Sequence, residues 1–374
     1  ALAGGPAVLP VEGPTDAGGG ADTTRADSSG SASVSAPDGS ALVIETSGST
    51  GGAKRVVLGA GALRASATAT LRRLGGPGRW LLPLPAHHVA GAQVVVRGLL
   101  AGHPPSVLDN RHGFRPDRFA AAATELFQAS GTRYYTSLVP TQLHRVLLEG
   151  GAALAAARGF HAVLVGGAAT PPALLVEART GGIAVVTTYG MSETAGGCVY
   201  DGVPLDGVRV RLDGDGRIEL GGPVLASGYL DQPELTAESF VDGWFRTSDL
   251  GRWAPDGTLR VLGRADDVIT TGGESVHPAA VERVLAAQPG VRAACVVSVP
   301  DPEWGQLVAA AVVCGPGAGP APDTGSWAEA VRAELGAPSV PRLVRVLDEL
   351  PVRGIGKPDR VEVARMLAAT RQAG

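Results

Sequence analysis

The sequence predicts an α/β protein in which a large layered α/β unit with an antiparallel β portion precedes a small α+β unit. In the first unit, short apolar runs bounded by Gly and Pro alternate with longer helical patterns, as expected for strands separated by helices. Between residues 208 and 260, short alternating strands are separated by Asp-Gly turns, which indicates antiparallel pairing. The chain has 374 residues, too many for one ordinary hydrophobic core. We therefore expect two domains.

The strands that we predict for the large unit are short apolar runs at residues 42–44, 80–82, 133–137, 162–165 and 183–187. The segment before them is different. It is dominated by Gly, Ala, Ser, Asp and Thr, whose burial cannot offset the entropy that is lost on ordering. We assign residues 1–40 to a residual strand at 7–10 and a flexible linker, and residues 41–265 to the large domain.

Residues 266–374 form the predicted small domain. Pro278 opens a helix with apolar residues on one face. Ser326 and Glu329 match a capping box, so a second helix is predicted to begin at Ser326. The other predicted elements are strands at residues 294–299, 307–313 and 343–347 and a last helix at 361–367.

Composition narrows the classes of function. The net charge is −4 without a basic block, so we do not expect a nucleic-acid partner. The uncharged apolar stretch at residues 80–96 is too short for a membrane span. Cys198, Cys295 and Cys314 show neither zinc-site spacing nor a C-x-x-C pair, which favours a reducing cytoplasm. We expect a cytoplasmic protein with small-molecule ligands, and the sequence leaves open whether it is a homo-oligomer.

The distribution of cations is the most unusual feature of the sequence. Thirty of the 32 basic residues are Arg, and the two Lys residues, Lys54 and Lys357, each adjoin a Gly-rich segment. Lysine is a compact point charge on a thin stem that can reach one oxygen in a narrow space, whereas Arg is a wide donor fork. We predict that each lysine binds a phosphoryl or carboxylate oxygen. The alternative is that both are exposed lysines without a role.

The first Gly-rich segment resembles a phosphate-binding loop. A strand at residues 42–46 leads into small and hydroxyl residues whose backbone N–H groups can surround phosphate oxygens. Ala53 and Arg55 flank Lys54 where a Walker loop needs Gly and Ser or Thr, so an ordinary P-loop is excluded. A triphosphate clamp and a surface turn both remain open. The predicted contacts are Thr46, Ser47, Gly48, Ser49, Thr50, Gly51 and Lys54.

Two further motifs carry groups that suit a nucleotide. In the segment 188–194, the ring of Tyr189 can stack on a purine, the Ser192 hydroxyl can contact phosphate, and Glu193 can hold Mg²⁺. A strand end followed by a helix cap explains this segment equally well. Asp249 can accept hydrogen bonds from ribose hydroxyls, braced by Arg264. For that isolated pair, a structural salt bridge is the alternative.

Together these motifs match, in order and spacing, the adenylate-forming superfamily of acyl-CoA synthetases, adenylation domains and luciferases. The resemblance covers about residues 41–365, with a shortened N-terminal part and three mild departures, at Ala53, Ser192 and Ser248. It implies that ATP is bound by the phosphate loop together with Gly166, Gly167, Ala168, Tyr189, Gly190, Ser192, Thr194, Asp249 and Arg264.

The same resemblance implies the chemistry. Lys357 would be the catalytic lysine, assisted by Arg264 and by Glu193 with its Mg²⁺. The small domain would be mobile, with its hinge at Asp266. After adenylation it would present the segment at Gly272 and Gly273 for the reaction with CoA.

Within the superfamily, the sequence is most similar to the o-succinylbenzoate-CoA ligases of menaquinone synthesis, through residues 82–91, 137–143 and 165–169. This similarity implies that 2-succinylbenzoate is the substrate and that His88 and Ser137 line its pocket. It also implies that Arg97, which interrupts the apolar run 94–100, receives the free carboxylate. A paired core arginine is the alternative for Arg97.

Two other classes of function stay open at this point. One is an aryl- or acyl-CoA ligase for a different acid. The other is a non-catalytic acyl-adenylate-binding protein, which would need no charge on the small domain, and Lys357 argues against it.

Overall fold

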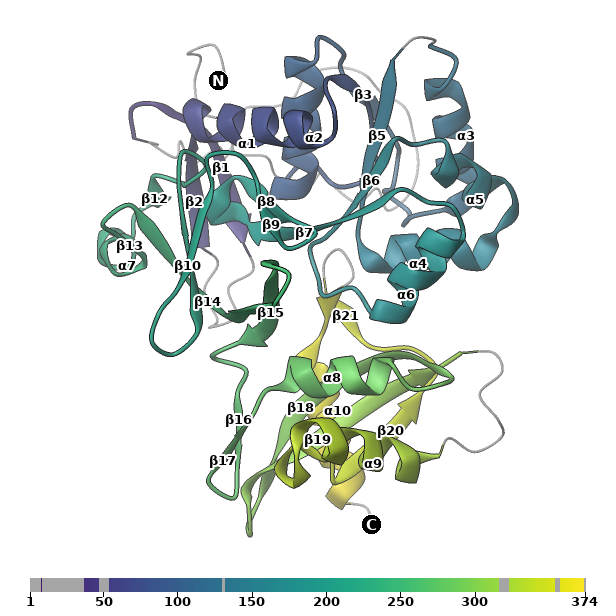
Figure 1. The fold of residues 1–374 in the computed structure, drawn as a ribbon, viewed down its shortest axis with the longest axis vertical. Helices are drawn as coiled ribbons and strands as arrows, with labels where there is room; N and C mark the ends of the chain where they lie inside the picture. Colours follow the sequence, from purple (N-terminus) through teal and green to yellow (C-terminus); the bar gives the residue numbers. More distant parts are fainter. Residues whose placement is uncertain are drawn as a thin grey trace, which may run out of the picture.

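The computed structural model describes residue 8 and residues 37–46, 54–129, 132–315, 323–353 and 357–372. Elements up to Arg264 build a larger unit, and elements from Ile269 onward build a smaller one, which lies below the larger unit in Figure 1. The predicted combination of a large mixed α/β unit and a small α+β unit is therefore confirmed.

A seven-stranded sheet forms the centre of the larger unit, in the order β4-β3-β5-β6-β7-β8-β9. The strands from β3 to β7 are parallel, and β8 and β9 return antiparallel to β7. Their bounds are Gly78–Leu82 (β3), Ser106–Val107 (β4), Arg133–Leu138 (β5), Ala162–Val165 (β6), Val185–Met191 (β7), Gly196–Tyr200 (β8) and Val203–Pro204 (β9).

Helices cover both faces of this sheet because successive strand residues point to opposite sides and both sides are apolar. Trp80 and Leu82 of β3 pack in a cluster with α1 and α2, whereas Leu81 belongs to the cluster formed with the other helices. The helix bounds are Ala60–Arg73 (α1), Val89–Leu100 (α2), Pro116–Leu126 (α3), Pro140–Glu149 (α4), Gly151–Arg158 (α5) and Pro172–Thr180 (α6).

Two antiparallel sheets complete the larger unit. One has the order β1-β2-β12, and the other the order β10-β11-β14-β13, with β15 paired to β14. The predicted turns at residues 213–216 and 255–257 join β10 to β11 and β14 to β15. The bounds are Ser40–Thr46 (β1), Lys54–Gly59 (β2), Ser192–Thr194 (a 3₁₀ helix, η1), Arg209–Leu212 (β10), Arg217–Gly221 (β11), Gly228–Tyr229 (β12), Pro233–Ser239 (α7), Phe240–Val241 (β13), Trp244–Trp253 (β14) and Leu259–Arg264 (β15).

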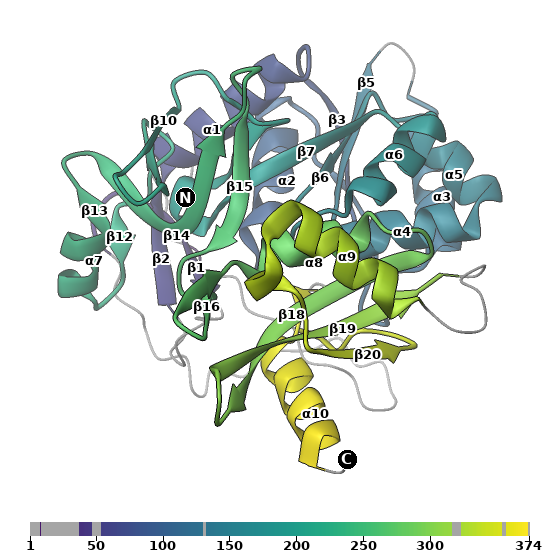
Figure 2. The ribbon, with the colours of Figure 1, turned by 60° about the horizontal axis from the view of Figure 1, so that its bottom comes forward.

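The smaller unit is a sheet in the order β17-β16-β19-β18, with β20 parallel to β19 (Figure 2). Helices α8 and α9 pack on one face of this sheet and α10 on the other. The bounds are Ile269–Thr271 (β16), Glu274–Val276 (β17), Pro278–Ala286 (α8), Val291–Asp301 (β18), Gly305–Cys314 (β19), Thr324–Leu335 (α9), Ala337–Ser339 (η2), Leu343–Leu347 (β20), Val352–Arg353 (β21), Lys357–Pro358 (β22) and Arg360–Gln372 (α10).

The predicted segment boundaries can be located in this fold. The boundary between residues 265 and 266 falls between β15 and β16 and stays a prediction. In the first segment, Val8 of the predicted residual strand forms a parallel bridge to Leu42. Residues 9–10 of that strand and residues 11–36 of the predicted linker lie outside the described residues. All three cysteines are free thiols. In the ranges that the structure describes, no helix is long and apolar enough to cross a bilayer.

Two local predictions were wrong. The strand predicted at residues 183–187 runs instead from Val185 to Met191, because β8 folds back on it and supplies hydrogen-bond partners. Tyr189 therefore lies within a strand and not after one. The capping box at Ser326 is also wrong: the carboxylate of Asp323 accepts hydrogen bonds from the backbone N–H groups of Gly325 and Ser326, so Asp323 is the N-cap of α9.

The Asp323 cap gives a stability prediction. Asp323→Ala should lower the free energy of unfolding by about 1 kcal/mol, because two end amides lose their acceptor. Ser326→Ala is the matched control, since the Ser326 hydroxyl only donates to the Asp323 carbonyl and caps no amide. Urea unfolding of both variants checks the assignment. An equal or larger loss of unfolding free energy in Ser326→Ala would instead support the capping box at Ser326.

Candidate functional site

The predicted phosphate loop is bracketed by a β-hairpin. Thr46 at the end of β1 pairs with Lys54 at the start of β2, and the Thr46 hydroxyl donates to the Lys54 carbonyl at 3.2 Å. Both ends of the loop are thus fixed by one sheet, and Lys54 begins a strand. The other predicted loop contacts, Ser47, Gly48, Ser49, Thr50 and Gly51, lie outside the described residues.

Tyr229 joins two of the predicted ATP residues. Strand β12 pairs with β2, which brings the Lys54 ammonium to 5.3 Å from the centre of the Tyr229 ring. The Tyr229 hydroxyl donates to Glu193 Oε1 at 2.9 Å. Burial and the nearby Glu193 carboxylate raise the pKa of Tyr229, so it stays a neutral donor. Sequence reasoning missed Tyr229, because only the β2–β12 pairing connects it to residues so far away in the chain.

Glu193 lies in the short helix η1, between two buried neighbours. Ser192 is buried, and the fully buried Thr194 hydroxyl accepts from the Met191 backbone N–H at 3.1 Å and donates to the Gly196 carbonyl at 2.8 Å. Thr194 therefore holds the turn that presents Glu193. The predicted nucleotide contacts of Ser192 and Thr194 stay predictions.

Close backbone approach explains the glycines beside Tyr189. A Cβ atom at Gly166 would lie 2.1 Å from Thr188 Oγ1, and one at Gly190 would lie 2.3 Å from the Gly196 carbonyl. Only glycine fits at either position. The segment Gly166, Gly167 and Ala168 follows β6 and thus lies beside β7, at the carboxyl edge where α/β sheets bind ligands.

Asp249 connects this edge to the antiparallel sheet. Tyr189 Oη donates to Asp249 Oδ2 at 2.8 Å, and Asp249 on β14 pairs with Arg264 on β15. Arg264 Nε donates to Asp266 Oδ1 at 2.9 Å, so the ion pair expected with Asp249 is formed with the predicted hinge residue. Burial raises the pKa of Asp249, although the Tyr189 hydrogen bond and the charges of Arg264 and Lys357 oppose the shift.

Lys357 lies in the smaller unit. It begins the two-residue strand β22, its side chain is exposed, and its charge acts on Asp249. The structure therefore brings Tyr189, Asp249 and Arg264 together, with Lys357 near enough for its charge to affect the pKa of Asp249. The Gly-rich residues 354–356 lie outside the described residues.

Gly272 and Gly273 form the turn between β16 and β17, with φ values of 57° and 86°. Both are in the left-handed region that favours glycine. A Cβ atom at Gly272 would also lie 2.7 Å from the Trp304 ring. The turn therefore requires glycine for its shape, and its role toward CoA stays a prediction.

The predicted acyl-pocket residues occupy different depths. His88 is the N-cap of α2, and Arg97 lies in the last turn of the same helix, nine residues on and thus about 13 Å along the axis. Ser137 is buried near the carboxyl end of β5. Helix α2 runs back along the sheet from its carboxyl edge, so Arg97 lies deeper than His88.

Arg97 is a core residue with 3% of its surface exposed. Its guanidinium lies 5.2 Å from the centre of the Trp80 ring and donates from Nη2 to the Tyr200 hydroxyl at 3.3 Å. Its Nε has no hydrogen-bond partner, and no carboxylate in the described ranges forms an ion pair with it. Burial lowers the pKa of Arg97. The alternative interpretation, a core arginine paired with a carboxylate, is thus not supported, because Arg97 has no ionic partner in the described ranges.

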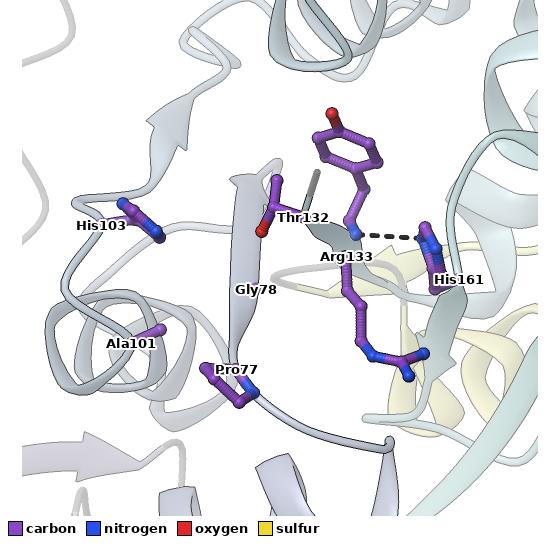
Figure 3. Close-up of a pocket in the computed structure, with 8 residues that line it drawn as sticks. Pro77, Gly78, Ala101, His103, Thr132, Arg133 and His161 are labelled. Carbon is purple, nitrogen blue, oxygen red and sulfur yellow. Dashed lines mark hydrogen bonds between the residues drawn. The ribbon is translucent and has the colours of Figure 1, made fainter. Parts of the chain in front are cut away.

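A cavity of about 610 Å³ opens elsewhere, at the amino ends of β3 and β5. Figure 3 shows His103 across this cavity from Arg133 and His161, so these cationic or titratable groups do not converge. Because Gly166 and Tyr189 lie toward the opposite end of the sheet, we do not assign this cavity to the nucleotide.

Within the described ranges, no group of three His, Cys, Asp or Glu side chains is arranged to hold a metal ion. Glu193 alone would fit Mg²⁺, which proteins commonly bind through one or two carboxylates together with substrate phosphates.

Comparison with known proteins identifies the family to which this chain belongs. The AMP-binding enzyme family model matches residues 8–230, and the model of the AMP-binding enzyme C-terminal domain matches residues 280–357. The chain belongs to the AMP-binding enzymes. The two matches fall on the larger and the smaller unit, and the second ends at Lys357.

Individual AMP-binding enzymes are similar over most of the chain. A probable 2-succinylbenzoate–CoA ligase of Mycobacterium tuberculosis is 47% identical over 335 residues, covering 88% of this chain and 85% of the relative. The structure of an amide bond synthetase from Marinactinospora thermotolerans has a TM-score of 0.76 and 31% identity, covering 88% of this chain and 70% of that one. The o-succinylbenzoate CoA synthetase of Bacillus subtilis, in complex with its acyl-adenylate intermediate, has a TM-score of 0.73 and 28% identity, with coverages of 87% and 69%.

The raised pKa of Asp249 predicts how this AMP-binding enzyme responds to pH. The pKa of Asp249 is higher in the folded state than in the unfolded state, so ionising Asp249 lowers the stability of the fold. This loss of stability is absent below the unfolded pKa, about 3.9, and is complete once the pH has risen through the folded pKa. Asp249→Asn removes this cost, so its Tm should equal or exceed that of wild type at pH 7. The difference should shrink toward pH 4.

Asp256→Asn is the control, because hydrogen bonds from Thr258 lower the pKa of exposed Asp256. Its effect on Tm should be small and of opposite sign at pH 7. Thermal unfolding across this pH range checks both variants, and a Tm for Asp249→Asn that falls as the pH rises from 4 to 7, relative to wild type, contradicts the argument.

Proposed function

We propose that this chain is a 2-succinylbenzoate–CoA ligase, an AMP-forming acid–thiol ligase of menaquinone synthesis. It would convert the acid and ATP to an acyl-adenylate and pyrophosphate, and then the acyl-adenylate and CoA to acyl-CoA and AMP. The 47% identity to the mycobacterial relative supports this acid over others. A cytoplasmic location and the formation of a homo-oligomer stay predictions.

Arg97 is the observation that carries the choice of acid. A guanidinium buried without a carboxylate costs several kcal/mol, and a substrate carboxylate that replaces the missing partner would offset this cost. Trp80 and Tyr200 contact Arg97, while Nε has no partner. 2-Succinylbenzoate retains one free carboxylate after the other is activated, which is the group that such a site would bind. An acid with a single carboxylate would leave Arg97 unpaired.

The residues at the carboxyl edge suit the nucleotide. The Gly166 segment and the Tyr189 ring would frame adenine, and Asp249 would accept from the ribose hydroxyls. Lys54 and the loop before it would bind the β- and γ-phosphates. Glu193, oriented by the Tyr229 hydroxyl, would hold Mg²⁺ together with the triphosphate. The bound ion would neutralise phosphate charge.

Lys357 would serve the first half-reaction. The substrate carboxylate attacks the α-phosphorus in line, and the Lys357 ammonium stabilises the negative charge that develops on both groups. Its charge already acts on Asp249, beside the expected ribose. The smaller unit would then rotate about Asp266, withdraw Lys357 and bring the Gly272 turn to the acyl-adenylate for attack by the CoA thiol.

An amine is a second possible acyl acceptor, because the structure of the amide bond synthetase matches this chain with a TM-score as high as that of the o-succinylbenzoate CoA synthetase. An assay of AMP release with a panel of acids, each with CoA or with an amine, distinguishes the two. We expect 2-succinylbenzoate with CoA to have the highest kcat/KM. Preference for a monocarboxylic aryl acid, or for an amine acceptor, would overturn the proposal.

Arg97→Leu tests the carboxylate receptor. We expect kcat/KM for 2-succinylbenzoate to fall by about 10- to 100-fold, the worth of a charge-assisted hydrogen bond. KM for ATP should hardly change, and Tm should rise or at least not fall, because the variant removes a buried charge that has no ionic partner. The matched substrate is a benzoate that lacks the second carboxylate, whose turnover should change little. Unchanged kcat/KM for 2-succinylbenzoate in the folded variant would remove Arg97 from substrate binding.

Lys357→Ala tests the two-step mechanism through its separate half-reactions. Acyl-adenylate formation should fall by about 10²–10³-fold, by analogy with the loss of one preorganised oxyanion donor. Preformed succinylbenzoyl-AMP with CoA should still yield thioester at a rate near that of wild type. Equal losses in both half-reactions would show that Lys357 is structural, and no loss in either would leave it without a catalytic role.

A further inference from the structure

Arg360 is a partly buried cation, three residues after Lys357, and its contacts differ from those of Arg97. Its Nη1 donates to Glu282 Oε1 at 2.6 Å and its Nη2 to Glu282 Oε2 at 3.0 Å, so the pair is bidentate. Nη1 also donates to the Val296 carbonyl at 2.7 Å, and Nε lies 3.6 Å from Asp267 Oδ2. Two carboxylates thus compensate one partly buried guanidinium.

These partners come from three other parts of the smaller unit. Glu282 is on α8, Val296 is on β18, and Asp267 directly follows the predicted hinge residue Asp266. Glu282 is itself held, because its Oε1 accepts from the Val296 backbone N–H at 2.8 Å. The charges of Glu282 and Asp267 raise the pKa of Arg360 despite its burial. Arg360 is therefore a rigid junction between the core of this unit and the segment at the hinge.

The segment that carries Lys357 has few other supports among the described residues. Strand β22 has two residues and pairs only with β21, through Arg353 with Lys357 and Val352 with Pro358. The Asp359 N–H donates to the Pro351 carbonyl at 2.8 Å, which continues this short ladder. Neither contact reaches the core of the unit. Arg360, three residues after Lys357, does reach it.

We propose that Arg360 is a positioning residue for Lys357: its pairs with Glu282 and Asp267 fix strand β22 to the core of the smaller unit and to the segment after the hinge. Lys357 then moves with the smaller unit as one body and enters the site in a single geometry. This inference rests on the proposed role of Lys357 in adenylation. It adds that the geometry of Lys357 is set from outside the site.

The proposal predicts a division between the kinetic constants. Misplacement of a catalytic group by about 1 Å can lower a rate by about 10²-fold. Arg360→Gln should therefore lower the rate of acyl-adenylate formation by about 10- to 100-fold. KM for ATP should stay within about twofold, because the proposed nucleotide contacts lie in the larger unit. Thioester formation from preformed succinylbenzoyl-AMP and CoA should stay near the wild-type rate, since Lys357 is then withdrawn.

Matched variants separate positioning from folding. Arg365→Gln is the control, because Arg365 is an exposed guanidinium on the same helix whose ion pair among the described residues is local, with Glu362 at 2.6 Å. It should leave both half-reactions unchanged. The double variant Arg360→Gln/Glu282→Gln leaves no buried carboxylate unpaired, and it serves if Arg360→Gln alone does not fold. It should show the same selective loss of adenylation. Arg360→Lys keeps the charge without the fork and should lie between wild type and Arg360→Gln.

A second-site test makes the assignment specific. In a Lys357→Ala background, Arg360→Gln should cause no further loss of adenylation, because the group that it positions is gone. Equal losses in both half-reactions, or a full additional loss in the Lys357→Ala background, would show that Arg360 is merely structural. Wild-type adenylation by a folded Arg360→Gln would overturn the inference alone. Wild-type adenylation by Lys357→Ala would instead overturn the proposed function on which it rests.

Discussion

The hydrogen bond from Tyr189 to Asp249 is the contact on which the geometry of the site depends. Tyr189 lies on β7 of the seven-stranded sheet, and Asp249 lies on β14 of the antiparallel sheet. One bond of 2.8 Å therefore joins the two sheets at the place where β15 leads the chain toward the smaller unit. Burial raises the pKa of the Asp249 carboxylate, and the hydrogen bond from Tyr189 opposes this shift. In such a buried environment, a polar ligand gains more from a hydrogen bond to the carboxylate than it would in water.

The buried Arg97 and the partly buried Arg360 show how ionic pairing separates a structural from a binding role. Arg360 has two carboxylates and a carbonyl within its reach, so its charge is satisfied by the protein. Arg97 has a tyrosine hydroxyl and an indole ring, and no carboxylate in the described ranges. A fold retains an arrangement like that of Arg97 at a cost in stability. We therefore interpret Arg360 as an internal anchor and Arg97 as a receptor for an external anion.

Tyr229 extends the same logic to the phosphate end of the site. Its ring lies under the Lys54 ammonium and its hydroxyl donates to Glu193. One side chain therefore contacts both the cation and the carboxylate that are predicted to act on the triphosphate. The pairing of β12 with β2 fixes this relation. Substrate phosphates would enter between groups whose spacing is already set, which lowers the cost of organising them on binding.

The sequence by itself determined the class of fold, several strands of both units, and the motifs that carry the chemistry, because these follow from local hydrophobic period, turn residues and short-range spacing. The apolar runs at residues 162–165 and 343–347 became strands with those bounds. It also singled out Lys54, Tyr189, Asp249 and Lys357 as residue types that suit a nucleotide. The extent of β7 and the cap of α9 were wrong, since a returning strand and a competing aspartate outweighed the local pattern. Only the tertiary structure decided that Tyr189 bonds to Asp249, that Tyr229 joins Lys54 to Glu193, and that Arg97 lacks an ionic partner whereas Arg360 has two. Such contacts join residues 36 to 175 positions apart, and strand pairing and burial, which no local pattern encodes, bring them together.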